Sequence, residues 1–131
     1  MDKIQVVYCE PGKLARIAEI DTDLAGLQQA VGGLIETSYP FEEEVCIVGN
    51  DEGKIMGMPL NRAIRDNDGD IMDIIAGPFF ICDCSGENFG SLNEEQQKRY
   101  LEKFKNPERF YRMPDNKIVA KPYTPVQEQS R

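Results

Sequence analysis

The sequence predicts a single α+β domain, in which a mostly antiparallel sheet of about five strands is packed on one face by two helices and followed by a partly mobile C-terminal tail. Three observations predict this fold class. Short β-branched runs are separated by turn residues, two other segments place apolar residues at the helical period, and 131 residues suffice for one domain with one core. Near the end the periodicity fades and Pro and Gln appear, which is typical of a mobile tail.

The chain begins with a predicted hairpin. Residues 4–9, IQVVYC, are apolar and β-branched, which indicates a strand. Pro11-Gly12 favours a tight turn through EPGK, and the apolar residues of LARIAEI indicate a returning strand over residues 14–20. We therefore expect these two strands to pair in antiparallel fashion.

A first helix is predicted directly after this hairpin. Asp21 or Thr22 can cap its start, and Gly32-Gly33 supplies the left-handed residue that ends it. Its apolar residues recur at the helical period, at Leu24, Leu27 and Val31. The following LIETSYPF segment is predicted to be extended.

The next apolar residues predict a second hairpin. Residues 45–48 form one arm and residues 55–58 the other, joined across Gly49–Gly53. The acidic run Glu42–Glu44 precedes this hairpin. Such a run either solvates a sheet edge and discourages strand pairing, or forms a patch on which a partner docks.

An aspartate-rich turn follows at residues 67–70, and an apolar run then bends at Gly77-Pro78 into a predicted buried strand. The turn does not fit a calcium-binding loop. If Gly69 takes the sixth position, Ile64 and Ile75 occupy the first and twelfth positions, where carboxylate ligands are needed. Since Asp and Asn are also the residues of an ordinary tight turn, no metal site is predicted here.

The second helix is predicted within SLNEEQQKRYLEKF. Ser91 followed by Glu94 matches a capping box, and acidic residues come early and basic residues late, as the helix dipole favours. Its apolar stripe consists of Leu92, Tyr100, Leu101 and Phe104. The helix either packs against the sheet or presents an exposed face to a partner.

Composition excludes several kinds of chemistry. The sequence contains no histidine, so it has no Ser-His-Asp or Cys-His machinery and no histidine metal ligand. None of the serines lies in a GxSxG turn. The four cysteines lie in or beside apolar runs without CxxC spacing, which favours a structural role over a four-thiolate site or a redox pair. We expect no enzymatic activity, no cofactor and no metal.

Charge is distributed unevenly along the chain. The net charge is −8; residues 1–90 hold 6 basic and 17 acidic side chains, whereas residues 91–131 hold 9 basic and 6 acidic ones. An acidic surface repels phosphates, so direct nucleic-acid binding by the main domain is not expected, although the basic tail can add a nonspecific contact. No run approaches the roughly 20 apolar residues of a spanning helix, and the first residues do not resemble a signal peptide. We expect a cytoplasmic protein.

Two arginines stand out because they are the only basic residues between Lys54 and Lys98. One interpretation is structural: Arg62 and Arg65 form salt bridges or hydrogen bonds with Asp66, Asp73 or the turn at 68–70. The other is functional, since a planar donor array suits an anionic ligand or partner. The candidate ligand- or partner-binding residues are Asn61, Arg62, Arg65 and Asp73.

Four blocks of the sequence resemble the DUF3846 family, a domain of unknown function. They are EPGK at 10–13, DLAGLQQAVGGLIE at 23–36, PLNRAIRDNDGDIMDIIAG at 59–77 and FGSLNEEQ at 89–96. The resemblance divides the chain into a family-like domain, residues 1–105, and a C-terminal extension and tail, residues 106–131. It also implies an Asn-Arg pair at 61–62 typical of the family, and a gene carried by bacteriophages, plasmids and conjugative elements, sometimes near antirestriction genes.

Two functions are compatible with these observations. The first is that of a non-catalytic accessory protein of a mobile element, which binds a protein partner, such as a host-defence component, through its acidic surface. A DNA mimic is its specific form, but here several acidic residues are used in turns. The alternative is a binder of, or an enzyme acting on, a small anionic ligand such as a nucleotide, held by Asn61, Arg62 and Arg65. The oligomeric state is not predicted.

Overall fold

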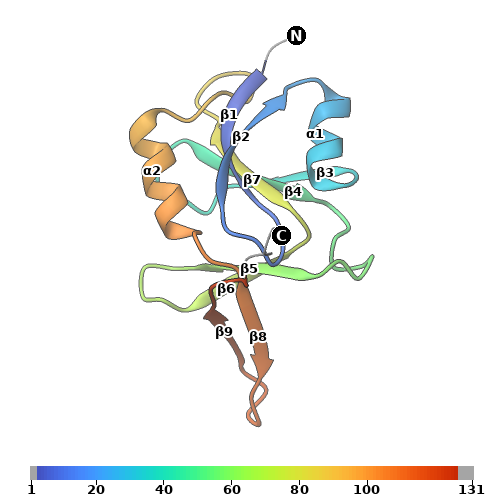
Figure 1. Cartoon of the computed structure of the whole chain (residues 1–131), viewed down its shortest axis with the longest axis vertical. Coiled ribbons are helices and arrows are strands. Elements are labelled where there is room, and N and C mark those ends of the chain that lie inside the picture. The colour runs from blue at the N-terminus through green and yellow to red at the C-terminus, as the bar shows by residue number, and fades with distance from the viewer. Residues whose placement is uncertain (1–2, 127–131) are drawn as a thin grey trace.

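A central sheet organises the fold in the computed structural model, which describes residues 3–126. Its five strands are antiparallel and follow the order β2-β1-β7-β4-β3 (Figure 1). They are β1 (Lys3–Cys9), β2 (Arg16–Asp21), β3 (Ile35–Ser38), β4 (Val45–Asn50) and β7 (Phe79–Asp83). The remaining elements are two helices and two hairpins: α1 (Leu24–Val31), α2 (Glu94–Lys103), β5 (Leu60–Arg65) with β6 (Ile71–Ala76), and β8 (Glu108–Arg112) with β9 (Ile118–Pro122). The predicted α+β class and five-stranded sheet are confirmed.

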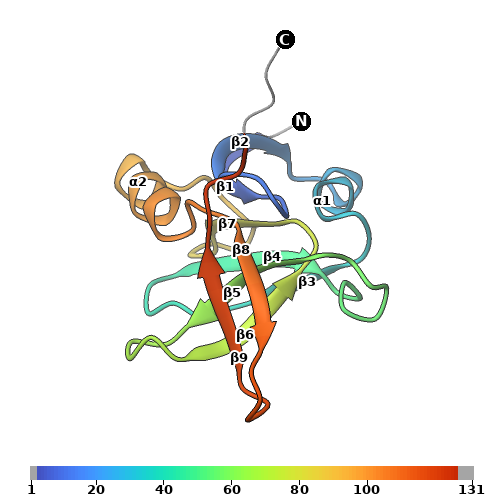
Figure 2. The ribbon, with the colours of Figure 1, turned by 60° about the horizontal axis from the view of Figure 1, so that its bottom comes forward.

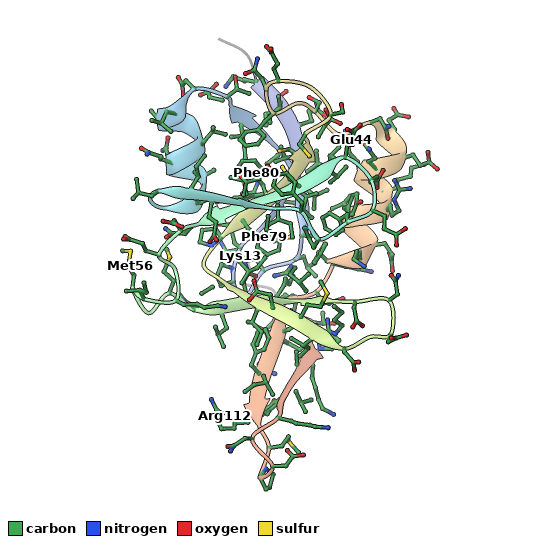
Figure 3. All side chains as sticks on the ribbon, turned by 180° about the vertical axis from the view of Figure 1, so that it is seen from behind. Lys13, Glu44, Met56, Phe79, Phe80 and Arg112 are labelled. Carbon is green, nitrogen blue, oxygen red and sulfur yellow. The ribbon has the colours of Figure 1, made fainter. Side chains whose placement is uncertain are left out.

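The central strands are apolar on both faces because the sheet is covered on both sides. Phe79 and Phe80 are neighbours on β7, are both fully buried, and belong to separate core clusters (Figure 3). Successive side chains of a strand point to opposite faces, so these two rings mark the two halves of the core. Every residue of β4 is buried for the same reason.

The two helices cover opposite faces of the sheet, which corrects the expectation that both cover one face. Leu27 and Val31 of α1 pack in the cluster of Phe80, whereas Tyr100 and the adjoining Phe104 at the end of α2 pack in the cluster of Phe79. The helices accordingly lie on opposite sides of the molecule (Figures 1 and 2). The apolar stripe of each helix was recognisable in the sequence, but the stripe does not specify which face of the sheet it meets.

Both helices begin at caps close to the predicted ones. Asp23 caps α1 by accepting from Gly26 N at 2.7 Å, and Gly32 ends the helix with a φ of 81°. In α2 the capping box consists of Asn93 and Gln96, two residues later than predicted. Ser91 instead accepts from Gln5 N at 2.9 Å and holds the approach to α2 against β1.

The predicted hairpin between residues 45 and 58 is wrong in its second arm. β4 forms as expected, but residues 51–57 form a loop of turns, and β4 pairs with β3 and β7. Ile55 is 86% exposed and Met56 lies at the outer side of this loop (Figure 3). Backbone groups of the loop form turn hydrogen bonds with one another, such as the one from Met56 N to Glu52 O, and do not pair with a strand. The apolar residues of this segment were therefore misleading evidence for a strand.

The β5–β6 hairpin uses the predicted aspartate-rich turn and packs on the face of the sheet that also holds α2. Ile64 and Ile75 contribute to the cluster of Phe79. The chain then bends at Gly77, with a φ of 84°, and enters β7 as predicted. In the described part of the chain, neither helix is long and apolar enough to cross a membrane.

The C-terminal extension contains a second hairpin that the sequence did not predict. Strands β8 and β9 pair over residues 108–122, and this hairpin, hereafter the arm, points away from the rest of the molecule (Figures 1 and 2). The predicted mobile tail includes residues 127–131, which lie outside the described residues.

Candidate functional site

Asn61 and Arg62 are buried inside the molecule, with exposed fractions of 0% and 1%. The Arg62 guanidinium donates to four backbone carbonyls: those of Phe104 at 3.0 Å, Lys13 at 2.8 Å, Glu10 at 3.3 Å and Lys105 at 3.4 Å. It also donates to Asn61 Oδ1 at 2.6 Å. Asn61 in turn donates to the carbonyls of Cys9 and Gly77 at 3.0 and 2.9 Å.

This arrangement joins three parts of the chain that are distant in sequence. Arg62 connects the EPGK turn between β1 and β2 to the end of α2, and Asn61 connects β1 to the bend at Gly77. Burial lowers the pKa of Arg62, while nearby Cys9 and Glu108 act in the opposite direction. Since an arginine stays charged in proteins, the carbonyl oxygens provide the solvation that water would otherwise give.

Arg65 lies at the surface beside the arm. Its Nη2 forms an ion pair with Glu108 Oε2 at 2.8 Å and donates to the carbonyl of Ala120 at 3.2 Å. The other oxygen of Glu108 accepts from the backbone N of Ala63 at 2.7 Å. Glu108 therefore attaches the base of the arm to β5 and satisfies a backbone donor on that strand.

Asp73 faces a different part of the surface. It pairs with Lys54 at 2.9 Å, and both side chains are largely exposed. The structure thus brings Asn61 and Arg62 together, places Arg65 beside the arm, and separates Asp73 from all three. The predicted partners Asp66 and Asp73 do not contact either arginine; backbone carbonyls and Glu108 do. The ligand hypothesis remains a prediction, but most of the Arg62 donors that it requires already have partners.

A broad groove, hereafter the acidic groove, lies between α2, the loop before β4 and the β5–β6 turn. Its volume is about 680 Å³, and its apolar lining consists of the half-buried Phe41 and the buried core residues Ile64 and Tyr100. Four carboxylates line it, Glu42, Glu43, Asp66 and Glu102, together with the cations Arg65, Arg99 and Lys103. Arg65 and Arg99 are paired with Glu108 and Glu43, whereas Glu42, Asp66 and Glu102 are exposed and form no ion pair with another residue between 3 and 126.

A hydrogen-bonded cluster fixes one wall of the groove. Glu43 accepts from the Tyr100 hydroxyl at 2.5 Å, from Arg99 at 2.9 Å and from Gln96 at 3.3 Å. The hydrogen bond from Tyr100 and the neighbouring donors lower the pKa of Glu43, whereas burial and the Glu43 carboxylate raise the pKa of Tyr100. The loop with the acidic run is thereby attached to α2, and Phe41 stacks on Tyr100 with ring centroids 4.8 Å apart.

The sequence indicated parts of this groove without assembling it. The acidic run at 42–44 was recognised as either a solvated edge or a docking patch, and Tyr100 as part of an apolar stripe. Nothing in the sequence indicated that Asp66 and Glu102 would line the same surface, because they come from segments whose packing depends on the whole fold.

The thiols are placed as core side chains. Cys46 and Cys82 face each other across β4 and β7 with their sulfurs 3.7 Å apart, and both are fully buried. Burial raises the pKa of Cys9 to about 12, although Arg62 lowers it in part. A buried thiol with a raised pKa is a poor nucleophile at neutral pH, so Cys9 is unsuited to that role.

Comparison with known proteins gives one match. A family model described as "Domain of unknown function (DUF3846)" matches residues 4–105. This range includes both helices and the first seven strands, and it ends just before the arm. No curated protein and no solved structure matches the chain.

Proposed function

The chain belongs to the DUF3846 family, and we propose that it is a non-catalytic protein that binds a protein partner through the acidic groove. The single observation that carries the proposal is the groove itself. Three carboxylates without ionic partners in the described chain, Glu42, Asp66 and Glu102, border it beside Lys103, and the Glu43 cluster holds one wall in place. A preformed apolar surface with a charged rim has the general composition of a protein interface.

The chemistry of the groove defines the partner. Lysine or arginine side chains of the partner pair with Glu42, Asp66 and Glu102, and an apolar side chain between them contacts the half-buried Phe41. Opposite charges across an interface mainly increase the association rate and the specificity. The partner is therefore a protein with a basic segment that carries at least one large apolar residue.

The family resemblance adds a setting to this proposal. In that setting the protein acts in the cytoplasm, as the product of a mobile element, on a component of host defence. Binding through one groove is favoured over mimicry of DNA, because a mimic needs a regular array of exposed carboxylates. Here Asp66 accepts from the backbone N of Asp68 and Asp70 and so serves the turn as well as the rim.

Affinity capture with matched charge variants tests the proposal. The whole chain serves as bait in extracts of cells that carry the element, alongside Glu42→Lys/Glu102→Lys. We expect the captured partner to be reduced at least about tenfold by these substitutions, since they reverse two rim charges. The control is Glu52→Lys/Glu87→Lys, which makes the same change at exposed positions outside the groove.

Two results would contradict the proposal. Equal capture by the wild type and the groove variant would show that the groove is not the docking surface. A nucleotide that co-purifies in stoichiometric amount, and is lost in Arg65→Glu, would favour the small-ligand alternative. Arg62→Glu is unsuitable for this purpose because it places an unpaired carboxylate among buried carbonyls.

A further inference from the structure

Three of the four thiols lie together on one face of the central sheet. Cys46 of β4 and Cys82 of β7 are directly opposite each other, with their Sγ atoms 3.7 Å apart. Cys84 follows Cys82 by two residues, so its side chain points to the same face, and it is a second hydrogen-bond partner of Cys46. All three pack in the cluster of Phe80, which is labelled in Figure 3. Cys46 therefore contacts two other thiols.

The backbone around the buried pair has the geometry that a disulfide requires. Cys84 N donates to Glu44 O at 3.0 Å, and these two residues continue the register that places Cys46 opposite Cys82. Hydrogen-bonded and non-hydrogen-bonded pairs alternate along antiparallel strands, so Cys46 and Cys82 are also a hydrogen-bonded pair, whose Cα atoms lie about 5.5 Å apart. A disulfide needs Cα atoms roughly 4.4–6.8 Å apart. Rotation of the two side chains can therefore join Cys46 to Cys82 without movement of the strands.

The three thiols differ in access and in charge. Cys46 and Cys82 are fully buried, whereas Cys84 is partly exposed, so a small oxidant in solution reaches Cys84 first. Hydrogen bonds from Cys82 and Cys84 lower the pKa of Cys46, while burial and the neighbouring Cys46 raise the pKa of Cys84 to about 11. The three thiols therefore share one thiolate. A proton shift from Cys84 to Cys46 along their hydrogen bond moves the negative charge to the exposed sulfur.

We propose that Cys46, Cys82 and Cys84, hereafter the thiol cluster, form a modification site at which a small peroxide produces a reversible Cys46–Cys82 disulfide, with Cys84 as the point of entry. The thiol cluster lies on the face of the sheet that α1 covers, whereas Ile64 and Tyr100 of the acidic groove belong to the other core cluster. The inference is therefore independent of the proposed function. In a reducing compartment, a disulfide of this kind is transient and responds to oxidation.

The first bond forms between Cys84 and Cys46. The Cys84 thiolate attacks one oxygen of hydrogen peroxide and the O–O bond breaks, which gives a sulfenic acid on Cys84 and a hydroxide that takes a proton from solvent to become water. Cys46 then attacks the Cys84 sulfur, the S–O bond breaks, and the leaving hydroxide takes the Cys46 proton as a second water. Two thiols have been oxidised to one disulfide, and one peroxide has been reduced to two waters.

The disulfide then moves to the buried pair. Cys46 and Cys84 are diagonal neighbours on adjacent strands, and the separation of such neighbours, about 7–8 Å, exceeds the range of an unstrained disulfide. Cys84 can approach Cys46 because β7 ends at Asp83, but the resulting bond is strained and labile. Cys82 attacks the Cys46 sulfur, the strained S–S bond breaks, and Cys84 leaves with the Cys82 proton. The final state joins the two central strands and restores the Cys84 thiol.

Peptide mass mapping tests the inference on the purified whole chain, treated with hydrogen peroxide and then alkylated. We expect a Cys46–Cys82 disulfide within one chain, which dithiothreitol reverses. Because this bond closes the segment between residues 46 and 82 in the unfolded chain, the oxidised protein should also unfold at a higher urea concentration than the reduced protein. Mapping that finds no disulfide, only over-oxidised Cys84, or only disulfides between two copies would overturn the inference.

Single substitutions separate the roles of the three thiols. Cys84→Ala removes the point of entry and should slow disulfide formation at least about tenfold. Cys82→Ala should stop the reaction at the Cys46–Cys84 disulfide, and Cys46→Ala should leave a sulfenic acid on Cys84 that dimedone traps. Cys9→Ala is the matched control, because Cys9 is also fully buried but packs in the other core cluster, and its loss should leave the rate unchanged.

The Cys84 variant gives the decisive comparison. Cys84 is only partly buried, so Cys84→Ala should fold even if a substitution at Cys46 or Cys82 disrupts the core; circular dichroism checks each variant. Disulfide formation in Cys84→Ala at the wild-type rate would overturn the inference, and so would loss of the disulfide in Cys9→Ala.

Discussion

Arg62 is the residue on which most long-range connections of this fold converge. A buried guanidinium is costly unless its donors are satisfied, and here backbone carbonyls and Asn61 satisfy them. The carbonyls of Glu10 and Lys105 also accept from Lys13 N at 3.2 Å and Ala15 N at 2.9 Å, whereas Arg62 is the donor to those of Lys13 and Phe104. Arg62 therefore stabilises the folded state by satisfying these groups as much as by filling space.

Arg62→Ala is expected to reduce the free energy of unfolding by about 3–5 kcal/mol, because it removes the donor to the carbonyls of Lys13 and Phe104 and opens a cavity. Urea unfolding followed by circular dichroism measures the change. Arg16→Ala is the matched control: Arg16 pairs at the surface with Glu10 of the same turn, at 3.4 Å, and its loss should cost less than about 1 kcal/mol. A reduction below 1 kcal/mol for Arg62→Ala would show that the carbonyl contacts contribute little.

The sequence identified Asn61 and Arg62 as important but not their partners. It predicted either acidic neighbours or an anionic ligand, since those are the groups that a list of side chains suggests. The actual acceptors are main-chain oxygens of Glu10, Lys13, Phe104 and Lys105, and every residue carries such an oxygen. Only the three-dimensional path of the backbone distinguishes these carbonyls from all others.

At the scale of elements, turns and helix ends were predicted correctly, because their conformation depends on residues that are adjacent in the sequence. The EPGK turn, the cap at Gly32 and the bend at Gly77 were predicted because turn residues and glycines restrict the backbone directly. The strand predicted at residues 55–58 does not form, and strands β8 and β9 were not predicted. In these cases apolar residues fitted more than one conformation, and pairing across the sheet determined which was adopted.

The junction between β6 and β7 requires glycine for two reasons, and substitutions can separate them. Gly77 has a positive φ of 84°, and a methyl group there would lie 2.8 Å from Met58 Sδ. Gly77→Ala is expected to reduce the free energy of unfolding by about 2–4 kcal/mol through backbone strain and overpacking. Chemical unfolding of the purified variant measures this loss.

Two matched glycines serve as controls for this junction. Gly69 has a φ of 87° in open space, so Gly69→Ala should show the backbone strain alone, about 1–2 kcal/mol. Gly86 has neither feature, and Gly86→Ala should change stability by less than about 0.5 kcal/mol. If Gly77→Ala costs no more than Gly69→Ala, the contact with Met58 is relieved without cost, and the packing part of the explanation is wrong.

At the scale of the whole molecule, the chain consists of an acidic body and a basic arm joined by a few specific contacts. The family match ends at residue 105, and the arm follows directly. Glu108 makes the main polar connection through Arg65 and Ala63 N, and the arm contributes nothing to either core cluster. These facts argue that the body folds without the arm.

A chain that ends at Pro107, and so keeps this buried residue, is therefore expected to fold cooperatively, with a free energy of unfolding lower by about 1–3 kcal/mol. The loss arises because Ala63 N and Arg65 lose the carboxylate of Glu108. Glu108→Ala in the whole chain should account for most of the same loss, since it removes the connection and keeps the arm. Urea unfolding of both proteins, followed by fluorescence and by circular dichroism, measures stability and cooperativity together. Absence of a cooperative transition in the shortened chain would mean that the arm belongs to the folding unit, and the division at residue 105 would then describe the sequence family but not the physical domain.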